Sequence, residues 1–172
     1  MFRELALPYC VVAGGMATWK RRWVEAAGWA TGIAMFFALF AWHMEQVKAQ
    51  LAGTEVAASA GLAQWLRFGG LDFVLLTTRM NSLLFAAPAW LLWGYLLVAL
   101  LGLSRKSDEA SQVACLAALM YLLAFAVLGR PENFYWGLLP APLLVWGVTS
   151  GMMAMTEVTR AGCAWNATAG VP

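Results

Sequence analysis

Long runs of apolar residues, separated by short polar segments, make up most of the chain. A helix needs roughly 20 apolar residues to cross a hydrocarbon core of ~30 Å. Four runs approach that length without an ionised side chain, and they are Ala26–His43, Ser82–Leu103, Ser111–Leu128 and Phe134–Met155. The pattern therefore predicts an all-α membrane protein with four transmembrane helices.

The composition supports this class and narrows the chemistry. Apolar residues make up 62% of the 172 positions and charged residues 12%, against about 45–50% and about 25% in a typical soluble chain. With one histidine and three cysteines, we expect no metal, cofactor or catalytic centre, and we interpret His43 as an interfacial polar residue. The net charge of +2 gives no basic surface for direct contact with nucleic acid.

The distribution of basic residues predicts the orientation. With the N-terminus in the cytoplasm, seven Lys and Arg residues fall on the inner side and four on the outer side, in agreement with the positive-inside rule. We therefore expect a multi-pass protein of the bacterial inner membrane with both termini inside. Its parts would be an interfacial or cytoplasmic segment (1–25), a transmembrane domain (26–155) and a cytoplasmic tail (156–172).

The outer segment 44–81 is too long for a simple hairpin connection. Glu55–Arg67 has apolar residues at helical spacing, which predicts an amphipathic helix on lipid or on a partner. A second helical run starts at Leu71, and without a strong breaker it is expected to continue to Leu103, over about 50 Å at 1.5 Å per residue. The residues expected to make outer-face contacts are Trp65, Asp72 and Arg79, the last two also forming a local polar tie.

Local signals refine these helices. Pro88 in the second run, and Pro140 and Pro142 in the fourth, each remove a backbone amide from an apolar run, so a kink is expected in both runs. Between the second and third runs, Ser107 is expected to cap the third helix, with Asp108 and Glu109 facing its positive N-terminal dipole. Between the third and fourth runs, a tight turn contains Arg130 and Glu132.

Two pairs of glycines spaced four apart provide the main signals for interaction. Gly28 and Gly32 lie in the first run, and Gly147 and Gly151 lie in the fourth, where Thr149 and Ser150 add hydroxyl groups. Such pairs let a neighbouring backbone approach closely within a membrane. The neighbour would be another helix of this chain or a helix of a partner chain, and we expect a partner helix against the second pair.

Three functions remain open from these residues. The apolar runs contain no ionisable group of the kind that ion and proton carriers use, so the first is a non-enzymatic scaffold that packs against partner helices and membrane lipid. The second is a small membrane enzyme acting on a lipid or a quinone, and the third is an accessory subunit of a respiratory or transport complex. The polar set of the enzyme would be Arg79, Asn81, Tyr95, Arg130 and Glu132.

Several weak motifs resemble a small membrane-protein family of integrating conjugative elements and conjugative plasmids, often called TraJ-like. They lie in Thr78–Pro88, Leu128–Pro131, Leu138–Leu144 and Gly147–Thr149, within a resemblance that extends from about Trp29 to Met155. The loop between the second and third runs carries only Arg105 and Lys106, and is shorter and less basic than is typical of that family. The resemblance implies a non-enzymatic inner-membrane component of a conjugative type IV secretion apparatus, which accompanies the coupling ATPase as its partner and brings no catalytic residues.

Overall fold

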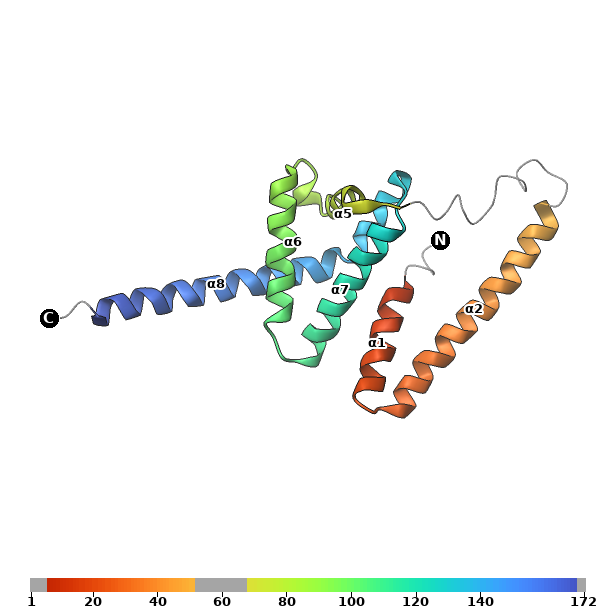
Figure 1. Cartoon of the computed structure of the whole chain (residues 1–172), viewed down its shortest axis with the longest axis horizontal. Helices are drawn as coiled ribbons and strands as arrows, with labels where there is room; N and C mark the ends of the chain where they lie inside the picture. Colours follow the sequence, from red (N-terminus) through yellow and green to blue (C-terminus); the bar gives the residue numbers. More distant parts are fainter. Residues whose placement is uncertain (1–5, 52–67, 170–172) are drawn as a thin grey trace.

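Helices form every regular element of the chain in residues 6–51 and 68–169, the part that the computed structural model describes (Figure 1). The helices are α1 (Leu7–Trp19), α2 (Trp23–Leu51), α5 (Gly70–Thr78), α6 (Ala89–Ser104), α7 (Glu109–Val127) and α8 (Ala141–Ala169), with the 3₁₀ helices η2 (Ser82–Leu84) and η3 (Pro131–Leu138). The predicted all-α class is therefore confirmed. The predicted amphipathic helix over Glu55–Arg67, which includes Trp65, lies outside the described residues.

The first two helices form a hairpin. Pro8 lies in the first turn of α1, where a missing amide costs no hydrogen bond. The turn between the helices places Arg21 at φ 56°, a left-handed conformation that reverses the chain over a few residues. An edge-on contact between Tyr9 and Trp29 then joins the two helices, with 6.1 Å between ring centroids. Figure 1 shows α2 standing to one side of the remaining helices, with α1 between them.

The core lies among α5, α6, α7, η3 and α8. Phe125 of α7 is 1% exposed and contacts the aromatic rings of Phe73 in α5 and Trp136 in η3, at 6.1 and 6.2 Å between centroids. Leu96 and Leu144 extend this core along α6 and α8. Aromatic rings from three elements thus fix the end of the bundle where α7 finishes.

The predicted continuous helix from Leu71 to Leu103 is wrong. α5 stops at Thr78, η2 follows, and α6 begins only at Ala89. Asn81 adopts an extended conformation and its side chain accepts a hydrogen bond from the amide of Leu83. Pro88, at ψ 157°, is also extended and has no amide to donate. The kink expected at Pro88 is therefore a complete interruption of the helix, and Asn81 adds an earlier one.

The second proline break bends the fourth apolar run. η3 and the first part of α8 meet at an angle of 56° around Leu139 and Pro140, which confirms the predicted kink. By length and composition, α2 and α7 could each cross a membrane, and the bent pair of η3 and α8 would make a third span; α6, with 16 residues, is shorter. The described part of the chain therefore carries two or three candidate membrane-spanning helices.

Two turns meet at one end of the bundle, which we call the turn end: the α1–α2 turn (residues 20–22) and the α6–α7 turn (residues 105–108). Glu109 joins them, because its carboxylate forms ion pairs with Lys20, at 2.9 Å, and with Arg22.

The opposite end of the bundle, which we call the break end, contains residues 79–88 and 128–140. At the turn end, the predicted cap of α7 is corrected, since Asp108 rather than Ser107 precedes the helix and accepts a hydrogen bond from the amide of Ser111 at 3.0 Å.

Candidate functional site

Small residues bring α8 against α6 of the same chain. A Cβ atom placed on Gly151 would lie 2.7 Å from the carbonyl oxygen of Val98, and one placed on Gly147 would lie 2.9 Å from the carbonyl carbon of Ala99. On the facing helix, a Cβ atom on Gly102 would lie 2.5 Å from the amide nitrogen of Gly151. The backbones are therefore in direct contact, and the neighbour at the Gly147–Gly151 pair is α6 rather than the expected helix of a partner chain.

The hydroxyl groups beside this pair have different environments. Ser150 is buried, at 8% exposed, on the side of α8 that carries the glycines. Thr149 is exposed, and its hydroxyl donates a hydrogen bond of 2.8 Å to the carbonyl oxygen of Trp146 in its own helix. The Thr149 hydroxyl is thus used within α8, while Ser150 belongs to the internal contact.

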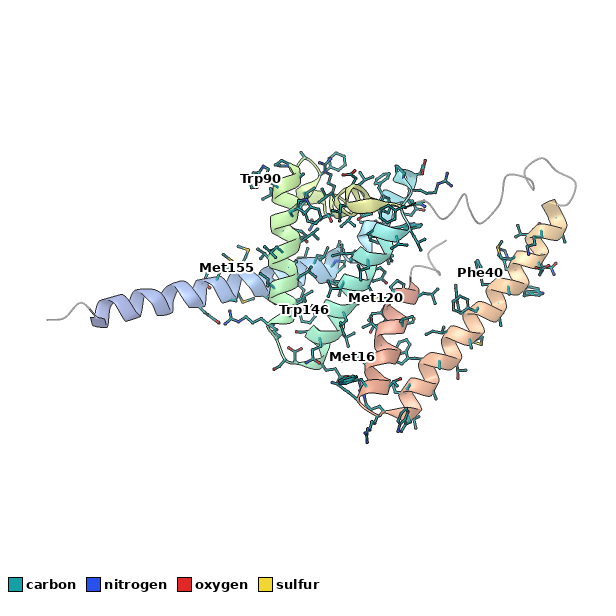
Figure 2. All side chains as sticks on the ribbon, viewed as in Figure 1. Met16, Phe40, Trp90, Met120, Trp146 and Met155 are labelled. Atoms are coloured by element: carbon teal, nitrogen blue, oxygen red, sulfur yellow. The ribbon has the colours of Figure 1, made fainter. Side chains whose placement is uncertain are left out.

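The first glycine pair has the opposite surroundings. Cβ atoms placed on Gly28 and Gly32 would meet no other atom within 4 Å. Both glycines lie on α2, where the described side chains are exposed or partly exposed and none is buried. Large apolar side chains, Phe40 among them, project from this helix (Figure 2). α2 is consequently a long apolar helix that, apart from its contact with α1 at Trp29, the described remainder of the chain leaves largely uncovered.

A small polar cluster lies at the break end. The Asn81 amide donates a hydrogen bond of 3.1 Å to the hydroxyl of Tyr95, which joins the segment before α6 to α6 itself. The Nε atom of Arg79 is buried and has no hydrogen-bond partner among the described residues. Asp72 is exposed and forms no ion pair with Arg79 in the described part of the chain, so the predicted tie between these two residues is not formed.

The structure brings together only part of the polar set considered for an enzyme. Asn81 and Tyr95 are bonded to each other, whereas Arg130 pairs locally with Glu132 at 3.7 Å across one turn of chain. The space beside Asn81 and Tyr95 is lined by Thr77, Gly137 and neighbouring residues. In the ranges that the structure describes, no three His, Cys, Asp or Glu side chains are grouped as metal ligands.

The contact between α6 and α8 and the ion pairs at the turn end both involve residues that the sequence did not identify for these roles. The first is Gly102, with Ala99 three residues before it, as the surface that receives α8; this pair does not have the spacing of four that marks close helix contacts in membranes. The second is Glu109 as the residue that pairs with the basic α1–α2 turn. No sequence signal connects these positions, which lie 87 residues apart in the case of Arg22.

No protein-family model, no curated protein and no solved structure matches the chain.

Proposed function

We propose that this protein is a non-enzymatic assembly subunit of the bacterial inner membrane and that α2 is the helix it contributes to a partner. One observation carries the proposal. The Gly28–Gly32 pair is open on a 29-residue apolar helix with no buried residue among those described, while the similar Gly147–Gly151 pair is filled by α6 of the same chain. One pair of glycines is thus packed against a helix of the same chain, and the other pair is open to a helix of a partner.

The energetic argument concerns the cost of glycine in a helix. Each glycine in a helix interior destabilises it by about 1 kcal/mol relative to alanine. At Gly147 and Gly151 that cost is offset by close backbone contact with α6. At Gly28 and Gly32 nothing within the described chain offsets it, and a partner helix that approaches the α2 backbone would do so.

The nature of the partner follows from the resemblance to the TraJ-like family. On that basis we assign the chain to a conjugative type IV secretion apparatus, with the membrane region of the coupling ATPase as the partner of α2. The protein would contribute packing surfaces rather than chemistry, and it would not contact DNA directly.

We further propose four spans, formed by α2, α6, α7 and the bent pair of η3 and α8, with the C-terminus in the cytoplasm and the 13-residue α1 lying beside α2 without crossing the membrane. The turn end would then face the cytoplasm, and this is supported by its basic residues Lys20, Arg21, Arg22, Arg105 and Lys106. A cysteine at Gln46, beyond the predicted first span, should react with a membrane-impermeant maleimide in intact cells. A cysteine at Ser107 should react only after permeabilisation, and the reverse result would exclude this orientation.

The test of the partner interface is the double substitution Gly28→Leu and Gly32→Leu. Because both positions are open, the isolated subunit should keep its melting temperature, while the partner should be lost from the complex purified in mild detergent. Gly94→Leu is the matched control, since Gly94 is also a helical glycine whose added Cβ atom would meet nothing within 4 Å, but it lies on α6. Retention of the partner by the α2 variant, or equal loss in the control, would overturn the proposal.

A further inference from the structure

A cleft of about 360 Å³ opens at the turn end, between α1, the start of α2, the start of α7 and the start of α8. Its volume lies at the lower end of the range of ligand sites, about 300–1,000 Å³. Most of its lining is apolar, with Met16, Val113 and Leu143 on three of its walls. Figure 2 labels Met16 and Trp146, which lie on α1 and α8 beside this space.

The charged residues of the cleft are confined to the α1–α2 turn and the starts of α2 and α7. Arg22, Glu25 and Glu109 all line it, and the guanidinium of Arg22 joins the two carboxylates, at 3.1 Å from Glu25. The Glu25 carboxylate has Arg22 as its single ion-pair partner among the described residues, so it retains free acceptor positions. The cleft has charged residues at one end and apolar walls elsewhere, so it is complementary to an amphiphilic ligand with a polar headgroup and an apolar chain.

A further cation stands at the α8 wall. The Lys106 ammonium lies 5.7 Å from the centroid of the Trp146 ring, a distance that fits a cation–π contact. Within the described part of the chain, Lys106 has no carboxylate within salt-bridge distance. Glu25 thus gives the cleft free acceptor positions, and Lys106, which does not itself line the cleft, places a cation against the Trp146 ring that does.

We propose that this cleft binds one molecule of phosphatidylethanolamine. The primary ammonium of the headgroup would donate hydrogen bonds to Glu25 and Glu109, the phosphate would lie near Lys106 and Arg22, and part of an acyl chain would follow the apolar walls. A zwitterion matches a rim that carries both signs of charge. Phosphatidylcholine has the same net charge but no N–H group to donate, and phosphatidylglycerol has no cation for the two glutamates.

The test is native mass spectrometry of the full chain, released from detergent after incubation with the three lipids carrying identical acyl chains. Phosphatidylethanolamine should be retained in preference to the other two. Glu25→Gln should lower its preference over phosphatidylcholine by up to about fivefold, the upper end of the range for an exposed ion pair. Glu45→Gln is the matched control, because Glu45 lies on the same helix and also pairs with a basic residue three positions away, outside the cleft.

Two further variants separate the headgroup from the acyl chain. Lys106→Gln should weaken the retention of phosphatidylethanolamine and phosphatidylcholine equally, through the phosphate they share. Ala110→Phe introduces a ring from an exposed position of the cleft wall and should remove the bound lipid while the melting temperature is unchanged. Equal retention of the three lipids, preference for phosphatidylglycerol, or the same effect from Glu25→Gln and Glu45→Gln would overturn the proposal.

Discussion

Replacing Gly102 by alanine tests the contact between α6 and α8 with a single methyl group. That group would lie 2.5 Å from the amide nitrogen of Gly151 and 2.9 Å from its Cα atom. The backbone carbonyl oxygen of Gly147 would lie closer still, and ordinary contact begins at 3.4 Å, so the two helices must separate by more than about 0.9 Å to accommodate the methyl group. Because all of these atoms belong to the backbone, no side chain can rotate away to relieve the overlap.

The cost of this separation can be bounded. A radial gap of about 0.5–1 Å removes a quarter to a half of the dispersion energy of the atoms it affects, and overpacking in a well-filled core typically costs about 1–3 kcal/mol. We expect Gly102→Ala to reach the upper part of that range, since small residues on both helices contribute to the same contact. The gain in helix propensity, about 1 kcal/mol, reduces the net loss to about 1–2 kcal/mol.

Thermal unfolding in detergent, followed by the fluorescence of the native tryptophans, measures this loss. Gly94→Ala is the matched control on the same helix, because its added methyl meets no atom within 4 Å. The control should leave the melting temperature unchanged or raise it, whereas Gly102→Ala should lower it. If both variants shift the melting temperature alike, the close approach of α6 and α8 does not stabilise the protein and the reasoning fails.

Three other outcomes are expected. Hydrogen bonds from the amide and hydroxyl of Ser111 hold the pKa of Asp108 below its usual value. The Asp108 carboxylate therefore contributes fully to stability above about pH 4, and this contribution is lost as the pH falls through the lowered pKa. Asp108→Ala should lower the melting temperature at pH 7, and the melting temperature of the variant should fall less steeply in acid. Gly137→Ala would place a methyl 2.6 Å from the carbonyl carbon of Thr77 and should cost about 1–3 kcal/mol, measured by thermal unfolding. His43→Ala should leave both function and assembly of the proposed complex, as purified in mild detergent, largely intact; loss of function from a subunit that is still folded and assembled would favour an enzyme.

The sequence predicts the long apolar helices α2 and α7 because their hydrophobicity depends on local residues alone, but it does not predict α1 as a helix and it joins α5 to α6. It also predicts kinks at Pro88 and Pro140, since a missing amide acts within one turn of helix. It does not predict the break at Asn81, because an asparagine side chain caps a turn only where the chain direction permits it. Likewise Asp108, and not Ser107, caps α7, although both residue types favour that position.

The glycine pairs show why the candidate site could be predicted only in part. Gly28–Gly32 and Gly147–Gly151 have the same spacing in similarly apolar runs. One pair is closed by α6 and the other is open, because the path of the chain brings α6 beside α8 and leaves α2 at the side of the bundle. That difference depends on tertiary packing, which a spacing rule does not describe.

The short α6 has a consequence for the surrounding bilayer. Its 16 residues extend over about 24 Å at 1.5 Å per residue, against a hydrocarbon core of about 30 Å. If α6 crosses the membrane, lipid beside it must compress or tilt, at a cost of a fraction of a kcal/mol for each ångström of mismatch. Subunits that cluster share one such deformed annulus, so bilayer elasticity would itself draw this protein towards other proteins with short spans and towards thinner regions of the membrane.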